Sequence, residues 1–324
     1  LECAKRLLAD GCAVTIMGRS ADRLSDAAST LEEIAPTRAL VRTVAGDAKS
    51  EDDVSAAVRV ATESTGGLNF AVASAGRGGL GPIITTPLEE WTEIVATNLT
   101  GTFLLFKHAG ATIASSGGGA MVAISSIAAA VTHPFMGPYC VSKAGVDMLV
   151  RQTADELGRA GVRVNAVRPG IVATDLVSMV MDDEQVMGSY LENMPVSRSG
   201  EVEDIGSVVR FLLGPESSWV TGTSLSVDGG HHLRRGPDFE PAARAFFGDD
   251  AVEGPRRSFS ERRLRSDRPH ELGADRFLDV ELGHRPLDIA RAHHGDELGE
   301  IRRARRHHLD AGARIGGAAH DLED

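Results

Sequence analysis

Residues 120–144 read AMVAISSIAAAVTHPFMGPYCVSKA, and the rest of the chain is interpreted from this stretch. The apolar run MVAIS at 121–125 has the character of a buried strand, and Ser126 follows it directly. Tyr139 and Lys143 are four residues apart, so a helix places them on one face, one turn apart. Pro138, which suits a first helical turn, precedes Tyr139. The stretch therefore predicts a strand, a loop and a helix that carries a phenol beside an ammonium group.

These three side chains suit the proton-transfer half of a carbonyl reduction or an alcohol oxidation. A free phenol titrates near pH ~10, and a nearby ammonium lowers this pKa by favouring the phenolate. The Ser126 hydroxyl can hold a carbonyl oxygen while Tyr139 gives or takes the proton. The hydride half of such a reaction needs a cofactor. The alternative is that Tyr139 and Lys143 are an exposed pair on a helix surface.

Strands and helices alternate along the chain on both sides of this stretch. Apolar runs with β-branched residues predict strands at 12–17, 39–47, 68–74, 121–125, 162–167 and 224–227. Helical patterns occur at 1–10, 20–34, 50–65, 87–115, 138–161 and 202–213. This alternation predicts an α/β fold, a doubly wound, Rossmann-type parallel sheet with helices on both faces.

The grouping of Ser126 with Tyr139-x-x-x-Lys143 resembles the active site of the short-chain dehydrogenase/reductase family, and the resemblance covers about residues 1–231. It implies an oxidoreductase that acts on a ketone or secondary alcohol with NADP(H) or NAD(H), and a homo-oligomer, either a tetramer or a dimer. Tyr139 is then the proton donor or acceptor, Lys143 tunes it and holds the ribose, and Ser126 positions the substrate oxygen. Asn98, in the segment TNLTG, matches the catalytic Asn of the family, whose implied role is to hold a water that links Lys143 to solvent.

The cofactor preference is predicted from the residues that follow the strand at 12–17. Ligands of a doubly wound sheet bind beyond the carboxyl ends of its strands. The triplet Gly18-Arg19-Ser20 has no carboxylate to bind two ribose hydroxyls, whereas Arg19 can form a fork onto a 2′-phosphate. We therefore expect NADP in preference to NAD, with Arg19 and Ser20 as contacts. The alternative is that Arg19 is a solvated surface side chain.

The resemblance implies further cofactor contacts at the ends of later strands. Asp47 would contact the adenine amine, and the backbone of Ala75 and Gly76 would line the cofactor. The sequence Ala73-Ser74-Ala75-Gly76 departs here from the Asn-Asn-Ala-Gly turn of the family. The segment that would hold the nicotinamide contains Pro169, Gly170, Val172 and Thr174.

The first ten residues, LECAKRLLAD, have the periodicity of a helix that ends at Gly11. In the family that the chain resembles, a first strand and a glycine-rich turn that holds the pyrophosphate precede this helix. We therefore interpret the sequence as a fragment that lacks this strand and turn, and we expect the fragment as given to be inactive.

The segment 177–195 lies where the family has its mobile substrate lid, and four of its residues are methionines: Met179, Met181, Met187 and Met194. Methionines line adaptable apolar pockets, although they serve as often in helix cores. This favours an apolar or acyl substrate, such as a 3-oxoacyl group. A second hypothesis is a non-catalytic nucleotide-binding or scaffold protein of the same fold.

The composition changes after residue 232. From His231 to Asp324 there are 17 Arg, no Lys, nine of the 11 His of the chain and 19 acidic residues. Few core-forming residues and a high charge density predict a disordered or weakly helical tail at 233–324, after a catalytic domain at 1–232.

The whole-chain composition excludes several classes of protein. A net charge of −12 argues against general binding to nucleic acid or anionic membranes. Three cysteines, Cys3, Cys12 and Cys140, have no metal-ligand spacing and suit reduced thiols in the cytoplasm. No run approaches the ~18 apolar residues of a membrane-spanning helix. We expect a cytoplasmic protein without a metal.

Overall fold

Six parallel strands form the centre of the fold in the computed structural model, which describes residues 1–35, 40–174, 177, 181–234 and 239–253. β1 pairs with β2, and a second sheet has the order β3-β4-β5-β6. The strands are β1 Val14–Gly18, β2 Val41–Ala45, β3 Phe70–Ala73, β4 Gly119–Ile124, β5 Val162–Pro169 and β6 Ser224–Val227. The parallel α/β architecture expected from the sequence is confirmed.

Helices connect these strands. The α-helices are α1 Glu2–Ala9, α2 Ala21–Ile34, α3 Glu51–Thr65, α4 Leu88–Val95, α5 Gly101–Ser115, α6 Gly137–Leu157, α8 Glu184–Asn193, α9 Val202–Leu213, α10 Glu240–Phe247 and α11 Asp249–Glu253. Shorter turns are η1 Ile83–Thr85, η2 Ala96–Thr100, η3 Ile127–Ala129, η4 Gly158–Ala160, η6 Pro215–Ser217 and η7 His231–Leu233. Among the described residues, no helix has both the length and the apolarity needed to cross a bilayer.

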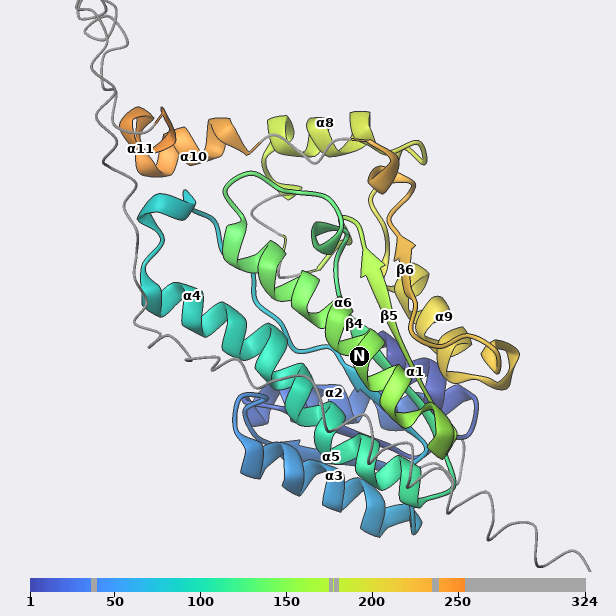
Figure 1. Cartoon of the computed structure of the whole chain (residues 1–324). Helices are drawn as coiled ribbons and strands as arrows, with labels where there is room; N and C mark the ends of the chain where they lie inside the picture. The colour runs from blue at the N-terminus through green and yellow to red at the C-terminus, as the bar shows by residue number, and fades with distance from the viewer. Residues whose placement is uncertain (36–39, 175–176, 178–180, 235–238, 254–324) are drawn as a thin grey trace, which may run out of the picture. The chain divides into compact units, whose positions relative to one another are not determined.

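Helices cover both faces of the larger sheet, and β4 shows why its sequence is continuously apolar. Met121 and Ala123 face a core formed with α3, α5 and α6, whereas Ala120 and Val122 face a core formed with α9. Successive side chains of a strand point to opposite faces, so a strand covered on both sides needs apolar residues throughout. Figure 1 shows α5 and α6 side by side on one face, with α1 and α9 on the other.

The two sheets do not join. β1 and β3 each pair with one strand, β2 and β4 respectively, and no described strand pairs with their other edges. A cavity of about 670 Å³ lies here, lined by 14–17 of β1 and 70–73 of β3 together with side chains of α1, α3 and α5. In the doubly wound order 3-2-1-4-5-6, this is the position of the first strand. The expectation that the sheet lacks this strand agrees with the structure.

The predicted helix at 87–115 is not regular. A π-helical turn, η2, separates α4 from α5 and contains Asn98. Such turns insert one residue into a helix and occur frequently at functional sites. The sequence pattern did not reveal the turn, because one inserted residue shifts the apolar periodicity by only a fraction of a turn.

Described residues beyond 232, where the predicted catalytic domain ends, pack against the rest of the fold. Phe239, which precedes α10, is only 4% exposed and packs with Ile171, Tyr190 and Met194. The residues at 239–253 form α10 and α11, so this part of the predicted tail continues the fold. The rest of the predicted tail lies outside the described residues.

Candidate active site

Ser126, Tyr139 and Lys143 are brought to one place by the end of β4 and the start of α6. Ser126 follows β4 and caps η3, where its Oγ accepts a hydrogen bond from the Ala128 amide at 3.1 Å. Tyr139 lies in the first turn of α6, with Pro138 beside it at the helix start, as predicted. The Lys143 Nζ lies 5.8 Å from the centre of the Tyr139 ring. The arrangement excludes the alternative of an exposed pair, because Lys143 is 5% exposed.

A backbone carbonyl of β4 holds the Lys143 ammonium in place. Its Nζ donates a hydrogen bond to the Ile124 carbonyl at the end of β4, at 2.8 Å. Gly76, after β3, approaches from the other side: a Cβ there would stand 3.5 Å from the Lys143 Nζ and 3.4 Å from the Asn98 Oδ1. The glycine therefore leaves open the space beside both polar groups.

Burial dominates the electrostatics of the site. Burial raises the pKa of the Tyr139 phenol, although a hydrogen bond to Ser126 acts in the opposite direction. This differs from the expectation that the ammonium lowers it, because desolvation of the phenolate is the larger effect. Burial also lowers the pKa of Lys143 to about 8, while the negative charge of Asp147 acts to raise it. Both groups are therefore pushed toward their neutral forms.

Asn98 is fully buried, and its side-chain amide holds the loop after β3 against α6. Its Oδ1 accepts from the Arg77 amide at 2.8 Å, and its Nδ2 donates to the Arg77 carbonyl at 3.0 Å and to the Ser142 Oγ at 2.9 Å. These bonds place Asn98 beside the residue that precedes Lys143 in the helix. Its role in holding a water stays a prediction.

Several residues near Tyr139 were not found by the sequence analysis. His133, in the loop before α6, is 5% exposed, and its ring lies 6.2 Å from that of His231. Tyr190 of α8 packs edge-on against His231 at 5.4 Å, and burial raises its pKa, as does the neighbouring charge of Tyr139. No motif marks these residues, since only the folded loops bring them together.

The loop that leads into α6 contains a constrained backbone position. Phe135 has φ of +67°, a conformation that bulky side chains rarely adopt. Its carbonyl accepts a hydrogen bond from the Gly81 amide at 2.7 Å, which joins this loop to the loop after β3. Strained positions of this kind cluster at functional sites.

The predicted adenosine contacts lie beyond β1 and β2. Arg19 and Ser20 follow β1, both exposed, and the Ser20 Oγ caps α2 by accepting from the Arg23 amide at 3.3 Å. Asp47 lies two residues after β2, where its Oδ1 accepts from the Lys49 amide at 2.9 Å. These residues follow strands of the two-stranded sheet, whereas Ser126 follows β4 of the four-stranded sheet.

The other predicted cofactor residues follow β3 and β5. Ala75 and Gly76 are exposed just beyond β3. Pro169 ends β5, and Gly170 packs so closely on Asp228 that a Cβ would lie 2.9 Å from its Cα. Val172 bridges to Gly200, and the Thr174 hydroxyl is exposed. The residues thus lie along the carboxyl ends of parallel strands, and an exposed guanidinium and exposed hydroxyls suit a phosphorylated dinucleotide.

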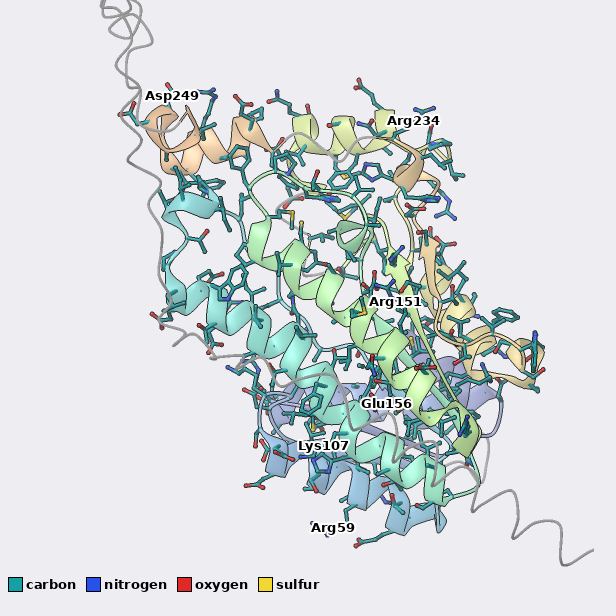
Figure 2. The ribbon with its side chains drawn as sticks, in the orientation of Figure 1. Arg59, Lys107, Arg151, Glu156, Arg234 and Asp249 are labelled. Atoms are coloured by element: carbon teal, nitrogen blue, oxygen red, sulfur yellow. The ribbon has the colours of Figure 1, made fainter. Side chains whose placement is uncertain are left out.

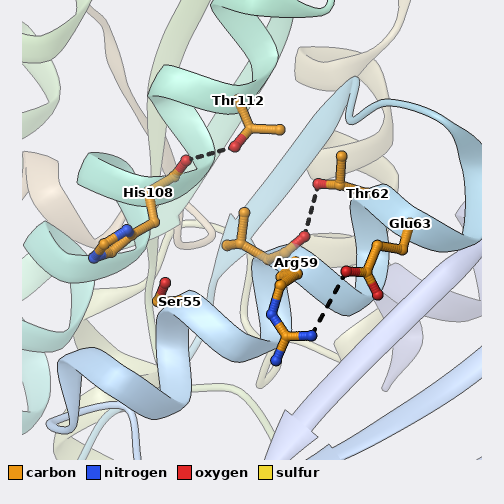
Figure 3. Close-up of a pocket in the computed structure, with 7 residues that line it drawn as sticks. Ser55, Arg59, Thr62, Glu63, His108 and Thr112 are labelled. Atoms are coloured by element: carbon orange, nitrogen blue, oxygen red, sulfur yellow. Dashed lines mark hydrogen bonds and ion pairs between the residues drawn. The ribbon is translucent and has the colours of Figure 1, made fainter.

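No group of three metal-ligating side chains comes together within the described residues. A separate hollow of about 260 Å³ lies between α3 and α5 (Figure 3). Several of its polar residues are engaged in contacts of their own: Arg59 pairs with Glu63 at 3.6 Å, the Thr62 hydroxyl donates to the Val58 carbonyl, and His108 contacts Glu51 at 3.0 Å. The hollow holds none of the predicted site residues, and we assign it no function.

Known proteins are similar to this chain over more than two thirds of its length. The family described as Enoyl-(Acyl carrier protein) reductase matches residues 1–232. Short-chain dehydrogenase/reductase eriH of Hericium erinaceus is 35% identical over 227 residues, 69% of this chain and 90% of that protein.

Solved structures give the same result. A short-chain type dehydrogenase/reductase from Mycobacterium ulcerans has 40% identity and a TM-score of 0.76, covering 78% of this chain and 92% of that chain. A 7 alpha-hydroxysteroid dehydrogenase complexed with NADH and 7-oxo glycochenodeoxycholic acid has 29% identity and a TM-score of 0.67, covering 71% and 88%. This chain belongs to the short-chain dehydrogenase/reductase family.

Proposed function

We propose that the chain carries the catalytic centre of an oxidoreductase that interconverts a ketone and a secondary alcohol with NADP(H), or with NAD(H) less readily. The observation that carries the proposal is the grouping of Ser126, Tyr139 and a buried Lys143 at the end of β4. Relatives of the chain are dehydrogenases and reductases, and one was solved with NADH and a 7-oxo ligand. NADP(H), when bound, supplies or accepts the hydride.

Each side chain has a distinct task in this proposal. The Ser126 hydroxyl donates a hydrogen bond to the substrate oxygen and fixes its position. The Tyr139 phenol gives its proton to that oxygen in reduction and removes it in oxidation. The Lys143 ammonium favours the phenolate, and it would hold the ribose of the bound cofactor. Asn98 holds the loop after β3 against α6 and supports the water that serves Lys143.

The preference for NADP rests on Arg19. Its guanidinium is exposed beyond β1, and no carboxylate occurs in Gly18-Arg19-Ser20 to bind a free ribose. Asp47, Ala75, Gly76 and the segment 169–174 complete the proposed binding surface.

The cavity between β1 and β3 limits what the chain does by itself. We propose that residues 1–324 alone are inactive, because neither a strand nor a glycine-rich turn occupies this position among the described residues. The turn is what holds the pyrophosphate in doubly wound folds. We define the extended chain as residues 1–324 preceded by the first strand and glycine-rich turn of a related short-chain dehydrogenase/reductase.

An apolar or acyl substrate, such as a 3-oxoacyl group, is favoured by the cluster beside the site. Tyr190, Met194 and Phe239 are buried together, with Met187 packed against them. Met181 lies outside this cluster, and the structure does not describe Met179.

We also propose a cytoplasmic homo-oligomer, a dimer or a tetramer. Phe103 of α5 and Val141 and Met148 of α6 are 46%, 51% and 55% exposed. Apolar side chains exposed on two adjacent helices suit a contact with a second copy. The cysteines are free thiols, as in a reducing compartment.

The test is the absorbance of the reduced nicotinamide in the extended chain with a panel of apolar ketones and 3-oxoacyl thioesters. Turnover that depends on Tyr139 supports the oxidoreductase. NADPH binding without turnover of any ketone or alcohol would favour the alternative, a non-catalytic nucleotide-binding or scaffold protein.

A further inference from the structure

Three functional groups are stacked along one face of α6. Tyr139, Lys143 and Asp147 follow one another at intervals of four residues, so they lie about one helical turn apart on the same side. Tyr139 and Lys143 belong to the predicted catalytic set. Asp147 is a carboxylate that the proposed mechanism leaves without a task.

Asp147 is buried although most charged residues of this helix are not. Its side chain is 3% exposed, whereas Arg151, Asp155 and Glu156 of the same helix are exposed, two of them labelled in Figure 2. An ionised carboxylate is costly to bury unless another charge compensates it. The burial of Asp147, one helical turn after Lys143, therefore needs an explanation.

The compensating charge comes from β5. The Arg168 Nε and Nη2 both contact the Asp147 Oδ2, at 2.7 and 2.6 Å, and Arg168 is itself 25% exposed. The second carboxylate oxygen, Oδ1, is buried and accepts no hydrogen bond from any described group. Arg168 thus fixes the carboxylate through one oxygen and leaves the other without a partner.

The other charged groups on elements packed against α6 do not supply a buried negative charge that would stabilise the Lys143 ammonium. η2 contributes the neutral amide of Asn98, and α4 contributes Glu90 and Glu93, which pair with Arg77 and Lys49. The charges of α5 are engaged as well: its two basic side chains at 107 and 108 contact Glu51. His133, in the loop before α6, and Tyr190 of α8 carry no negative charge at neutral pH. Asp147 is the buried negative group that remains on the helix face of Lys143 within the described residues.

We propose that Asp147, held in place by Arg168, is a positioning residue that keeps the Lys143 side chain charged inside the protein. For catalysis this inference rests on the proposed function, but the charge state of Lys143 can be measured without substrate or cofactor. Burial lowers the pKa of Lys143 to about 8, and Asp147 acts against this lowering. At pH 7, a group with a pKa of about 8 is roughly nine-tenths protonated.

The two partners should act on Lys143 with opposite signs. Loss of the Asp147 charge removes an attraction, so the lysine gives up its proton at a lower pH. Loss of the Arg168 charge removes a repulsion and leaves Asp147 without its cation, so the lysine keeps its proton to a higher pH. If Asp147 and Arg168 served only packing, the two substitutions would not shift the pKa of Lys143 in opposite directions.

The chain suits a direct measurement, because it contains only four lysines, Lys5, Lys49, Lys107 and Lys143. The Cε resonances of lysine labelled with ¹³C are followed against pH in the full chain of residues 1–324. We expect Asp147→Asn to lower the pKa of Lys143 by about one pH unit or more, and Arg168→Gln to raise it. Asp155→Asn, an exposed acid on the same helix, is the matched control and should leave it unchanged.

The double variant Asp147→Asn/Arg168→Gln replaces both charged groups by neutral amides. It leaves no unpaired charge, so it is the variant to measure if Asp147→Asn alone does not fold. It should also lower the pKa of Lys143, by less than Asp147→Asn alone. A Lys143 resonance that titrates like the other lysines in the wild type, or shifts of the same sign in both single variants, would overturn the proposal. Because the readout needs no turnover, a chain without activity can still support it, and an active chain can still refute it.

Discussion

In the proposed mechanism, Tyr139 is the residue on which proton transfer depends. Its burial raises the pKa of the phenol, which suits proton donation to a carbonyl oxygen, and a hydrogen bond links it to Ser126. The chain contains only one other tyrosine, Tyr190, whose ring packs against His231. The two tyrosines therefore form a natural pair of test and control.

We expect Tyr139→Phe in the extended chain to lower kcat by about 10²–10⁴-fold, because the proton donor is lost while the ring stays in place. The affinity for NADPH should stay within about twofold. Steady-state kinetics and fluorescence titration measure the two quantities. Tyr190→Phe should keep most of the turnover, and wild-type kcat in Tyr139→Phe would remove the phenol from the mechanism.

Arg19 should set the choice of cofactor. A charge-assisted hydrogen bond to a phosphate contributes about 1.5–3 kcal/mol, so Arg19→Ala should lower kcat/KM for NADPH by about 10–100-fold and change that for NADH little. Arg42→Ala is the control, since Arg42 is exposed on β2 and bonds to a carbonyl of its own strand. An unchanged ratio of the two specificity constants would show that Arg19 does not touch the 2′-phosphate.

At the scale of elements, the π-helical turn η2 joins the loop after β3 to α6. Asn98→Ala would remove three hydrogen bonds and leave both backbone groups of Arg77 without this partner. Each buried polar group left unpaired costs about 1–3 kcal/mol, so unfolding by urea should show a loss of that size or more. Asn193→Ala removes one bond to Ser189 within α8 and should cost less. Equal losses would mean that Asn98 is an ordinary helix residue.

α10 is the element that the sequence assigned to the tail. Phe239 anchors it against α8, so Phe239→Ala should lower the free energy of unfolding by about 3–5 kcal/mol, as for other buried phenylalanines. Phe246, which is 64% exposed, is the matched control, and Phe246→Ala should change stability little. Similar melting temperatures for both variants would show that α10 does not stabilise the domain, and the domain would then end at residue 232 as predicted from the sequence.

Elements with a strong local signal were predicted well. α9 spans Val202–Leu213 and β6 spans Ser224–Val227, the ranges read from their apolar patterns, and Ser20 and Ser50 cap α2 and α3 through their hydroxyls. α10 was missed because one buried phenylalanine in a charged segment gives no periodicity. Asp147, Arg168 and Tyr190 were missed because their importance depends on burial and on contacts between distant segments.

At the scale of the whole molecule, the interruption of the sheet between β1 and β3 is the basis for the proposal that residues 1–324 alone are inactive. The proposed catalytic side chains lie beside the larger sheet and the predicted adenosine contacts follow strands of the smaller one, and the cavity of about 670 Å³ lies between β1 and β3 of the two sheets. A strand in this cavity would pair with β1 and β3 and join both halves of the cofactor site into one sheet. Backbone groups along both edges would then gain partners, which should also stabilise the fold.

The most direct test compares residues 1–324 with the extended chain in parallel titrations with NADPH, followed by fluorescence, and in turnover with an apolar ketone. The account predicts that the extended chain binds NADPH with a micromolar Kd and turns over the ketone, and that residues 1–324 alone do neither. Micromolar binding and turnover by residues 1–324 alone would contradict it.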